Sequence, residues 1–162
     1  ERWVEVAGHG EADIRESILG MRLSSSDGGL VKTLKNYLDQ FQQHHQIQTN
    51  LLLPEIHSET RLDTMVEVQI LRILQEALTN ISKHAQAENV SIEFNFDDSI
   101  LCISVKDDGK GFEIIEDDTA LDSHFGLQMM RERAEAIGSK IWLESQPGLG
   151  TEIRVCVPLI KN

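Results

Sequence analysis

The chain has 162 residues and carries 15 Lys and Arg against 27 Asp and Glu, which gives a formal net charge of −12. That length suits one well-buried domain and is short for two. The negative charge argues against nonspecific binding of nucleic acid or anionic lipid, which both need a basic surface, but not against a nucleotide held in a local pocket.

Apolar residues recur at helical spacing from the N-terminus to about residue 24, which predicts a helix there. A break rich in Ser and Gly follows over 24–29 and marks the expected domain boundary. We therefore expect residues 1–26 to belong to one unit and 27–162 to another. Because the helical pattern begins without a cap, we also expect the chain to be part of a longer protein.

The rest of the chain alternates between helical and strand patterns. Apolar stripes with a period of 3.6 residues predict helices, and strict alternation of apolar and polar residues predicts strands. The predicted helices cover about 29–45, 62–86 and 126–138, and the predicted strands cover about 46–53, 90–96, 101–105, 140–145 and 151–158. Hairpins require antiparallel pairs, which excludes a doubly wound parallel sheet. We expect an α+β fold, a two-layer sandwich with three helices on one face of a mixed, mostly antiparallel sheet of five strands.

The sequence has two cysteines, Cys102 and Cys156, which are too few for a disulfide framework. Both lie in apolar strand-like runs, so we expect reduced cysteines in the core of a cytosolic protein. No segment approaches the roughly 20 apolar residues that a membrane-spanning helix needs.

A row of polar residues runs beside the apolar stripe of the predicted helix over 62–86. Glu76, Asn80, Lys83 and His84 lie three and four apart and are therefore neighbours on a helix surface. An acid, an amide, a cation and an imidazole in one row can coordinate a metal-bound polyphosphate. The alternative is an ordinary solvated face, which most surface helices have.

Two strands carry a polar residue on the side that is otherwise apolar. Asp107 continues the inward parity of its strand, so its carboxylate is aimed at the apolar side and needs a hydrogen-bond partner there. It could accept a hydrogen bond from the exocyclic amine of adenine, with Gly109 and Gly111 leaving room beside it. Thr151 begins the apolar row of the last strand, after Gly150, and could join Asp107 around a base. The alternatives are an exposed Asp-Gly turn and a simple β-turn.

Residues 112–124 lack a regular period, and His124, Phe125, Gly126 and Leu127 open the next predicted helix. A glycine at the start of a helix lets backbone N–H groups approach a phosphate closely. The sequence contains no GK[ST] motif and no GxGxxG after a strand, so a Walker loop and a dinucleotide fold are both disfavoured.

In their order along the chain, these four pieces resemble the N, G1, G2 and G3 boxes of the GHKL ATPase superfamily, which includes gyrase, heat-shock chaperones, histidine kinases and mismatch-repair proteins. The segment QEALTNISKHA at 75–85 is similar to the N box of NarL-type sensor histidine kinases, and GLQMMRERA at 126–134 is similar to their G2 segment. DDGKGF at 107–112 resembles the G1 box, with Asp108 where Asn is frequent, and GLGT at 148–151 resembles the G3 box.

The resemblance implies an ATP-binding catalytic domain that transfers the γ-phosphate of ATP to a histidine on a dimerisation domain, for relay to a response regulator. It implies ATP and Mg²⁺ as cofactors, Asn80 as the Mg²⁺ ligand, Asp107 as the reader of adenine and Glu76 as a catalytic residue. The further ATP-binding residues that it implies are Lys83, His84, Gly109, Gly111, His124, Gly126, Leu127, Gly150 and Thr151.

Residues 12–18 resemble the second dimerisation helix of these kinases, whose first helix carries the phosphoacceptor in a His-Asp motif. No His-Asp pair occurs in this sequence, so we expect the acceptor helix to lie outside this chain. The expected partners are a NarL-type response regulator and, in the full-length protein, a second copy bound through the dimerisation helices, while the chain alone can be a monomer. We expect no nucleic-acid partner and a cytoplasmic location, with a membrane anchor of the full-length protein left open.

Three alternatives share the fold. A serine kinase of the anti-sigma-factor type would not need the helix over 1–24. A gyrase-type or mismatch-repair ATPase would need a further transducer domain. A non-catalytic nucleotide-binding scaffold would not need the complete set of polar motif residues.

Overall fold

The computed structural model describes residues 29–54, 62–97, 99–114 and 125–159. The helix expected over 1–24 and the expected domain boundary lie outside these residues. The elements are α2 (Gly29–His45), β1 (Gln48–Leu52), α3 (Thr64–Asn80), the π-helical turn η1 (Ile81–Ala85), β2 (Asn89–Asp97), β3 (Ile100–Asp107), α4 (Phe125–Ala136), β4 (Ile141–Ser145) and β5 (Thr151–Pro158). In this part of the chain no helix is long and apolar enough to cross a membrane.

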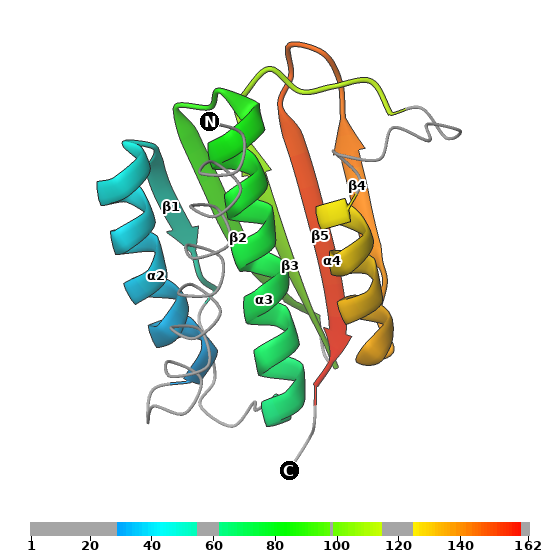
Figure 1. Cartoon of the computed structure of the whole chain (residues 1–162). Coiled ribbons are helices and arrows are strands. Elements are labelled where there is room, and N and C mark those ends of the chain that lie inside the picture. The colour runs from blue at the N-terminus through cyan, green and yellow to red at the C-terminus, as the bar shows by residue number, and fades with distance from the viewer. Residues whose placement is uncertain (1–28, 55–61, 98, 115–124, 160–162) are drawn as a thin grey trace, which may run out of the picture.

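The five strands form one sheet in the order β1-β2-β3-β5-β4. β1 runs parallel to β2, and all other neighbours are antiparallel. The helices α2, α3 and α4 cover one face of this sheet, as Figure 1 shows. The predicted α+β sandwich is therefore confirmed.

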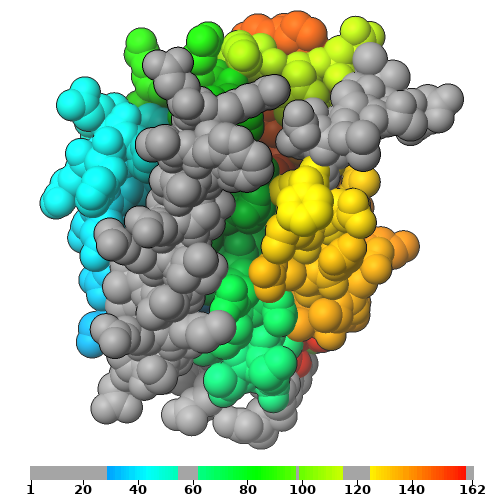
Figure 2. Space-filling model, viewed as in Figure 1, coloured from blue at the N-terminus to red at the C-terminus, as the bar shows by residue number. Residues whose placement is uncertain are grey.

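The core lies between the sheet and the helices, because the regularly spaced apolar side chains of each element face inward. α2 buries Leu30, Leu34 and Phe41 at helical spacing. β2 and β3 bury every second residue, from Val90 to Phe94 and from Leu101 to Val105. α4 packs along α3, as Figure 2 shows on the helical face of the molecule.

The helix predicted over 62–86 changes from α-helical to π-helical geometry near its C-terminal end. It begins with an N-cap at Asp63, whose carboxylate accepts a hydrogen bond from the N–H of Met65 at 2.8 Å. Its α-helical part ends at Asn80, the π-helical turn η1 follows, and Gln86 takes a left-handed conformation with φ 53°. The predicted helix is therefore confirmed in extent, and only its last turn departs from α-helical geometry, with the wider i→i+5 bonding.

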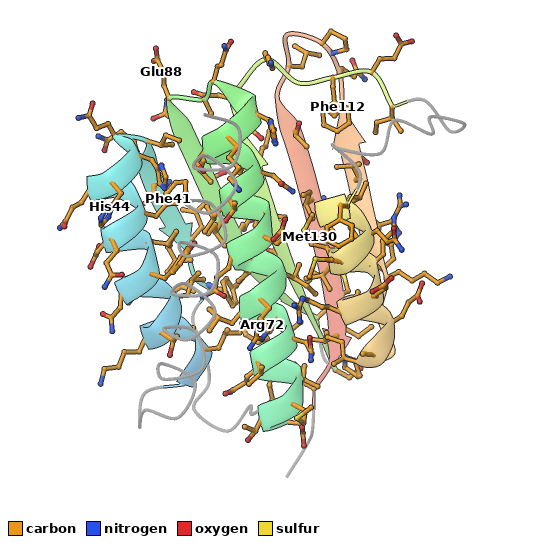
Figure 3. The ribbon with its side chains drawn as sticks, in the orientation of Figure 1. Phe41, His44, Arg72, Glu88, Phe112 and Met130 are labelled. Atoms are coloured by element: carbon orange, nitrogen blue, oxygen red, sulfur yellow. A yellow bond between two sulfur atoms is a disulfide. The ribbon has the colours of Figure 1, made fainter. Side chains whose placement is uncertain are left out.

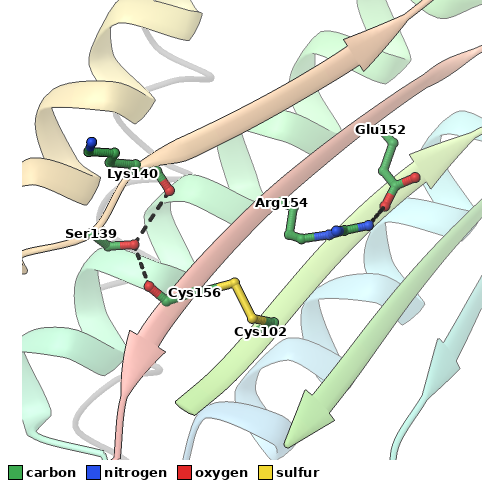
Figure 4. The surroundings of a disulfide bond; sticks show 6 residues. All are labelled: Cys102, Ser139, Lys140, Glu152, Arg154 and Cys156. Atoms are coloured by element: carbon green, nitrogen blue, oxygen red, sulfur yellow. Dashed lines mark hydrogen bonds and ion pairs between the residues drawn. A yellow bond between two sulfur atoms is a disulfide. The ribbon is translucent and has the colours of Figure 1, made fainter. Parts of the chain in front are cut away.

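The two cysteines are joined by a disulfide across β3 and β5, with their Cα atoms 4.0 Å apart (Figure 4). The register places Cys102 directly opposite Cys156. Both alternate with buried neighbours such as Leu101 and Val155, so the same parity that buries those residues turns the sulfurs to the other face of the sheet. The expectation of reduced cysteines in the core is therefore wrong.

Candidate functional site

β3 ends in a buried carboxylate. Asp107 is 3% exposed, and its Oδ1 accepts a hydrogen bond from the N–H of Gly109 at 2.8 Å. Burial raises the pKa of Asp107 above its ordinary value; backbone hydrogen bonds from Gly109 and Thr151 oppose that rise, and the charge of Asp108 adds to it. The predicted inward direction of Asp107 is confirmed, and an exposed Asp-Gly turn is excluded at this position.

The raised pKa of Asp107 predicts a pH dependence of folding stability. A folded-state pKa above the unfolded value stabilises the fold in acid, and this contribution is lost as the pH rises through the folded pKa. We expect Asp107→Asn, which does not titrate, to gain stability relative to the unmodified chain as the pH rises from the ordinary aspartate value of 3.8 toward neutrality. Urea unfolding of both chains without nucleotide measures the difference, and a difference that stayed constant or shrank with pH would contradict the raised pKa.

Two glycines let the loop after β3 and the turn before β5 pack backbone to backbone. Gly150 has φ +76°, and a Cβ there would collide with the carbonyl oxygen of Asp107. Gly111 has φ +56°, and a Cβ there would collide with the carbonyl oxygen of Gln146. Only glycine adopts these conformations readily and leaves this space, so both positions depend on it.

Thr151, which is partly buried, begins β5 within a network of hydroxyl groups. Its Oγ1 lies 2.8 Å from Oγ of Ser145, the last residue of β4. Ser145 Oγ also lies 3.1 Å from the carbonyl oxygen of Gly150 and accepts a hydrogen bond from the N–H of Phe112 at 2.9 Å. Ser145 is not among the site residues predicted from the sequence. The signal that could have found it is the hairpin register, which pairs Ser145 with Thr151.

The loop after β3 also packs against the end of η1. Gly109 is buried, and a Cβ on it would collide with the carbonyl oxygen of Ala85. The N–H of Lys110 donates to that same oxygen at 2.8 Å. Lys83 and His84 lie exposed on η1.

The start of α4 lies against the polar row of α3. A Cβ on Gly126 would collide with Oε1 of Glu76 and would lie 3.2 Å from both side-chain amide atoms of Asn80. Leu127 is partly buried against the core, and Met130, which is fully buried, lies between α4 and α3 in Figure 3. Gly126 therefore allows the close approach that brings α4 to Glu76 and Asn80.

The structure brings the predicted residues together in two connected groups. The groups are Asp107, Gly109, Gly111, Gly150 and Thr151 at one end of β3 and β5, and Glu76, Asn80, Gly126 and Leu127 along α3 and α4. The end of η1, with Lys83 and His84, adjoins the first group through Ala85. His124 lies outside the described residues.

The oxygen donors at α3 fit a hard divalent cation. Glu76 offers a carboxylate and Asn80 an amide oxygen, both side chains are half-buried, and both lie next to Gly126 at the start of α4. Oxygen ligands of this kind are those that Mg²⁺ prefers, with water and substrate phosphates supplying the rest.

Comparison with known proteins places these motifs in one family. The family model described as "Histidine kinase-, DNA gyrase B-, and HSP90-like ATPase" matches residues 65–161. The sensor histidine kinase LiaS of Bacillus subtilis is 34% identical over 160 residues, covering 98% of this chain and 42% of LiaS. The histidine-protein kinase/phosphatase DegS of Brevibacillus brevis is 32% identical over 149 residues, covering 91% of this chain and 37% of DegS. The chain thus spans less than half the length of these relatives.

Solved structures share the fold. The blue-light activated histidine kinase of Erythrobacter litoralis EL346 matches with a TM-score of 0.74 at 17% identity, over 93% of this chain and 49% of that one. The histidine kinase AdeS of Acinetobacter baumannii matches with a TM-score of 0.66 at 16% identity, over 96% of this chain and 79% of that one. With a family model that covers more than half of its residues, the chain belongs to the histidine kinase-, DNA gyrase B- and HSP90-like ATPases.

Proposed function

We propose that this chain is the ATP-binding catalytic domain of a two-component sensor histidine kinase. It transfers the γ-phosphate of ATP to a histidine on a dimerisation domain, for relay to a response regulator of the NarL type. The main support for the proposal is the buried carboxylate of Asp107. It accepts hydrogen bonds from the backbone N–H groups of Gly109 and Thr151, which belong to two motifs far apart in sequence. The loop that follows it also packs against the end of η1. The names of the relatives favour a sensor kinase over other members of the family.

In this proposal the base of ATP lies at the end of β3 and β5. Asp107 accepts a hydrogen bond from the 6-amino group of adenine, and Thr151 and Gly111 complete the base pocket. Gly109 and Gly150 allow the backbones around Asp107 to approach each other. A buried acceptor that finds a matching donor is selective, because a ligand without that donor leaves the carboxylate unpaired.

The phosphates lie toward α3 and α4. Asn80 binds the Mg²⁺ that accompanies ATP, and the N–H groups at the start of α4, beside Gly126 and Leu127, face the phosphates. Lys83 and His84, exposed on η1, and His124 supply further phosphate contacts. When bound, Mg²⁺ supplies neutralisation of phosphate charge, which together with positioning dominates phosphoryl transfer.

Glu76, which lies beside Asn80 on α3, is the catalytic residue and acts as an acid–base group. The attacking nitrogen belongs to the dimerisation domain, so the transfer is a reaction between domains. Residues 1–26 are proposed to belong to the second dimerisation helix and 27–162 to the catalytic domain. The full-length protein is a dimer through those helices, and its catalytic domain works in the cytoplasm.

Asn80→Ala tests the proposed metal ligand. We expect the variant to lose the Mg²⁺-dependent part of ATP or ADP affinity, about tenfold, because one oxygen ligand is removed. Titration calorimetry with and without Mg²⁺ measures this, and Asn95→Ala, which changes an exposed residue of β2, is the matched control. Metal dependence that Asn80→Ala left unchanged would remove Asn80 from the metal site.

A further inference from the structure

Both carboxylate oxygens of Asp108 are engaged by the chain segment that leaves η1. Oδ1 accepts hydrogen bonds from the backbone N–H groups of Glu88 and Asn89, each at 2.9 Å. Oδ2 accepts a hydrogen bond from Nδ2 of Asn89 at 2.7 Å. The side-chain bond from Asn89, followed by the backbone bonds from Asn89 and Glu88, lowers the pKa of Asp108 below its ordinary value, so the side chain is a carboxylate at neutral pH.

These hydrogen bonds join the loop after β3 to the segment that leaves η1, which is about 20 residues away in sequence. Together the two segments form one junction. The N–H of Asp108 donates to the carbonyl oxygen of Asn89 at 3.2 Å. Two residues further along the chain, the N–H of Lys110 donates to the carbonyl oxygen of Ala85 at 2.8 Å. The carbonyl oxygen of Glu88 accepts a hydrogen bond from the N–H of Gln48 at 2.9 Å, which ties β1 to the same segment. The loop after β3 is therefore fastened to the end of η1 on both sides of Gly109.

We propose that Asp108 is a positioning residue of the nucleotide site: paired with Asn89, it fixes the loop that holds Asp107 against the π-helical turn that carries Lys83 and His84. The inference rests on the proposed function, in which Asp107 reads the base and η1 lies beside the phosphates. Asp108 acts through its neighbours, because its two oxygens bond to the protein chain.

The pair can be exchanged without losing its hydrogen bonds. A carboxylate only accepts hydrogen bonds, whereas an amide both donates and accepts. With Asn at position 108 and Asp at position 89, the amide oxygen would still accept from the two backbone N–H groups, and the amide nitrogen would donate to the new carboxylate. Asn89→Asp alone would instead place two carboxylates side by side, where Nδ2 of Asn89 now donates to Oδ2 of Asp108 at 2.7 Å, and the two negative charges would repel each other.

The experiment compares four chains by titration calorimetry with ADP and Mg²⁺, at a temperature where all are folded. They are the unmodified chain, Asn89→Asp, the exchanged pair Asn89→Asp/Asp108→Asn, and Asn95→Asp as a control. Asn95 is an exposed residue on the same strand, so its substitution adds the same charge away from the junction. We expect Asn89→Asp to raise the Kd about tenfold, the exchanged pair to return it to within about threefold, and the control to leave it unchanged.

Amide hydrogen exchange at Lys110 gives a second readout, which does not depend on nucleotide. Its N–H bonds to Ala85 across the junction, so we expect faster exchange in Asn89→Asp and recovery in the exchanged pair. A general loss of stability would instead raise exchange throughout β2 and β3.

Equal Kd values for the unmodified chain and Asn89→Asp, or an exchanged pair that bound no better than Asn89→Asp, would overturn this inference alone. If the unmodified chain bound no nucleotide, the proposed function would be overturned, and the inference with it. Should Asn89→Asp fail to fold, Asp108→Ser replaces it, because it shortens the acceptor without placing charge against charge. An unchanged Kd in folded Asp108→Ser would overturn the inference, and a Kd raised several-fold would support it.

Discussion

Replacing Asp107 with Ala is expected to weaken ATP binding by about ten- to hundred-fold in a chain that still folds. The carboxylate is buried and is held by the N–H groups of Gly109 and Thr151, so it is fixed before the base arrives. Its loss leaves the 6-amino group of adenine without an acceptor in a place that water reaches poorly. An unmatched buried polar group costs roughly 1–3 kcal/mol, which corresponds to the expected range of affinity.

The same carboxylate should make the unmodified chain prefer ATP over GTP by a similar factor. Guanine presents a carbonyl oxygen where adenine has its amino group, so the carboxylate would face another acceptor. Titration calorimetry with both nucleotides measures the preference, and Asp97→Ala, which removes an exposed carboxylate at the far end of β2, is the control. Equal affinity for ATP and GTP, or ATP binding unaltered in folded Asp107→Ala, would remove Asp107 from the base pocket.

This chain alone is expected to bind ATP without phosphorylating itself on histidine. Phosphoryl transfer needs the nucleophile in line with the γ-phosphate, and the sequence contains no His-Asp acceptor motif. Of the histidines that the structure describes, His44 and His45 end α2, and His84 lies on η1, where we propose that it contacts the phosphates of ATP.

Incubation with γ-labelled ATP followed by acid treatment measures self-phosphorylation, because phosphohistidine is labile in acid. We expect no stoichiometric acid-labile label on this chain. Such a label, mapped to His9 for example, would contradict the expectation that the phosphoacceptor histidine lies outside this chain.

The sequence predicts the burial of Asp107 because the side-chain period of a strand is two, and a single polar residue in an apolar row stands out. The helices and strands could be predicted for the same reason, since the regularly spaced apolar residues of each one face a common core. The helix over 62–86 shows the limit of this reasoning. Apolar spacing continues through η1, and the change to π-helical bonding leaves no mark in a pattern of apolar and polar residues.

Ser145 could be found from the sequence only by extending the β4–β5 hairpin register to its pair with Thr151. Features that depend on pairing between distant segments could not be predicted. The disulfide needs the register that sets Cys102 opposite Cys156, although the parity of β3 already turns Cys102 away from the core. The bonds of Asp108 likewise depend on Asn89, which no local pattern connects with it.

Transfer of phosphate to a separate dimerisation domain is the direct test of whether this chain is the catalytic domain of a histidine kinase. The chain is incubated with γ-labelled ATP, Mg²⁺ and a dimerisation domain that carries a His-Asp helix, taken from a similar kinase. We predict an acid-labile label on the histidine of that domain, weak because no linker raises the effective concentration, and absent when Asp107→Ala replaces this chain. An acid-stable label on a serine of an added protein, or no transfer by a chain that binds ATP, would contradict the assignment as the catalytic domain of a histidine kinase.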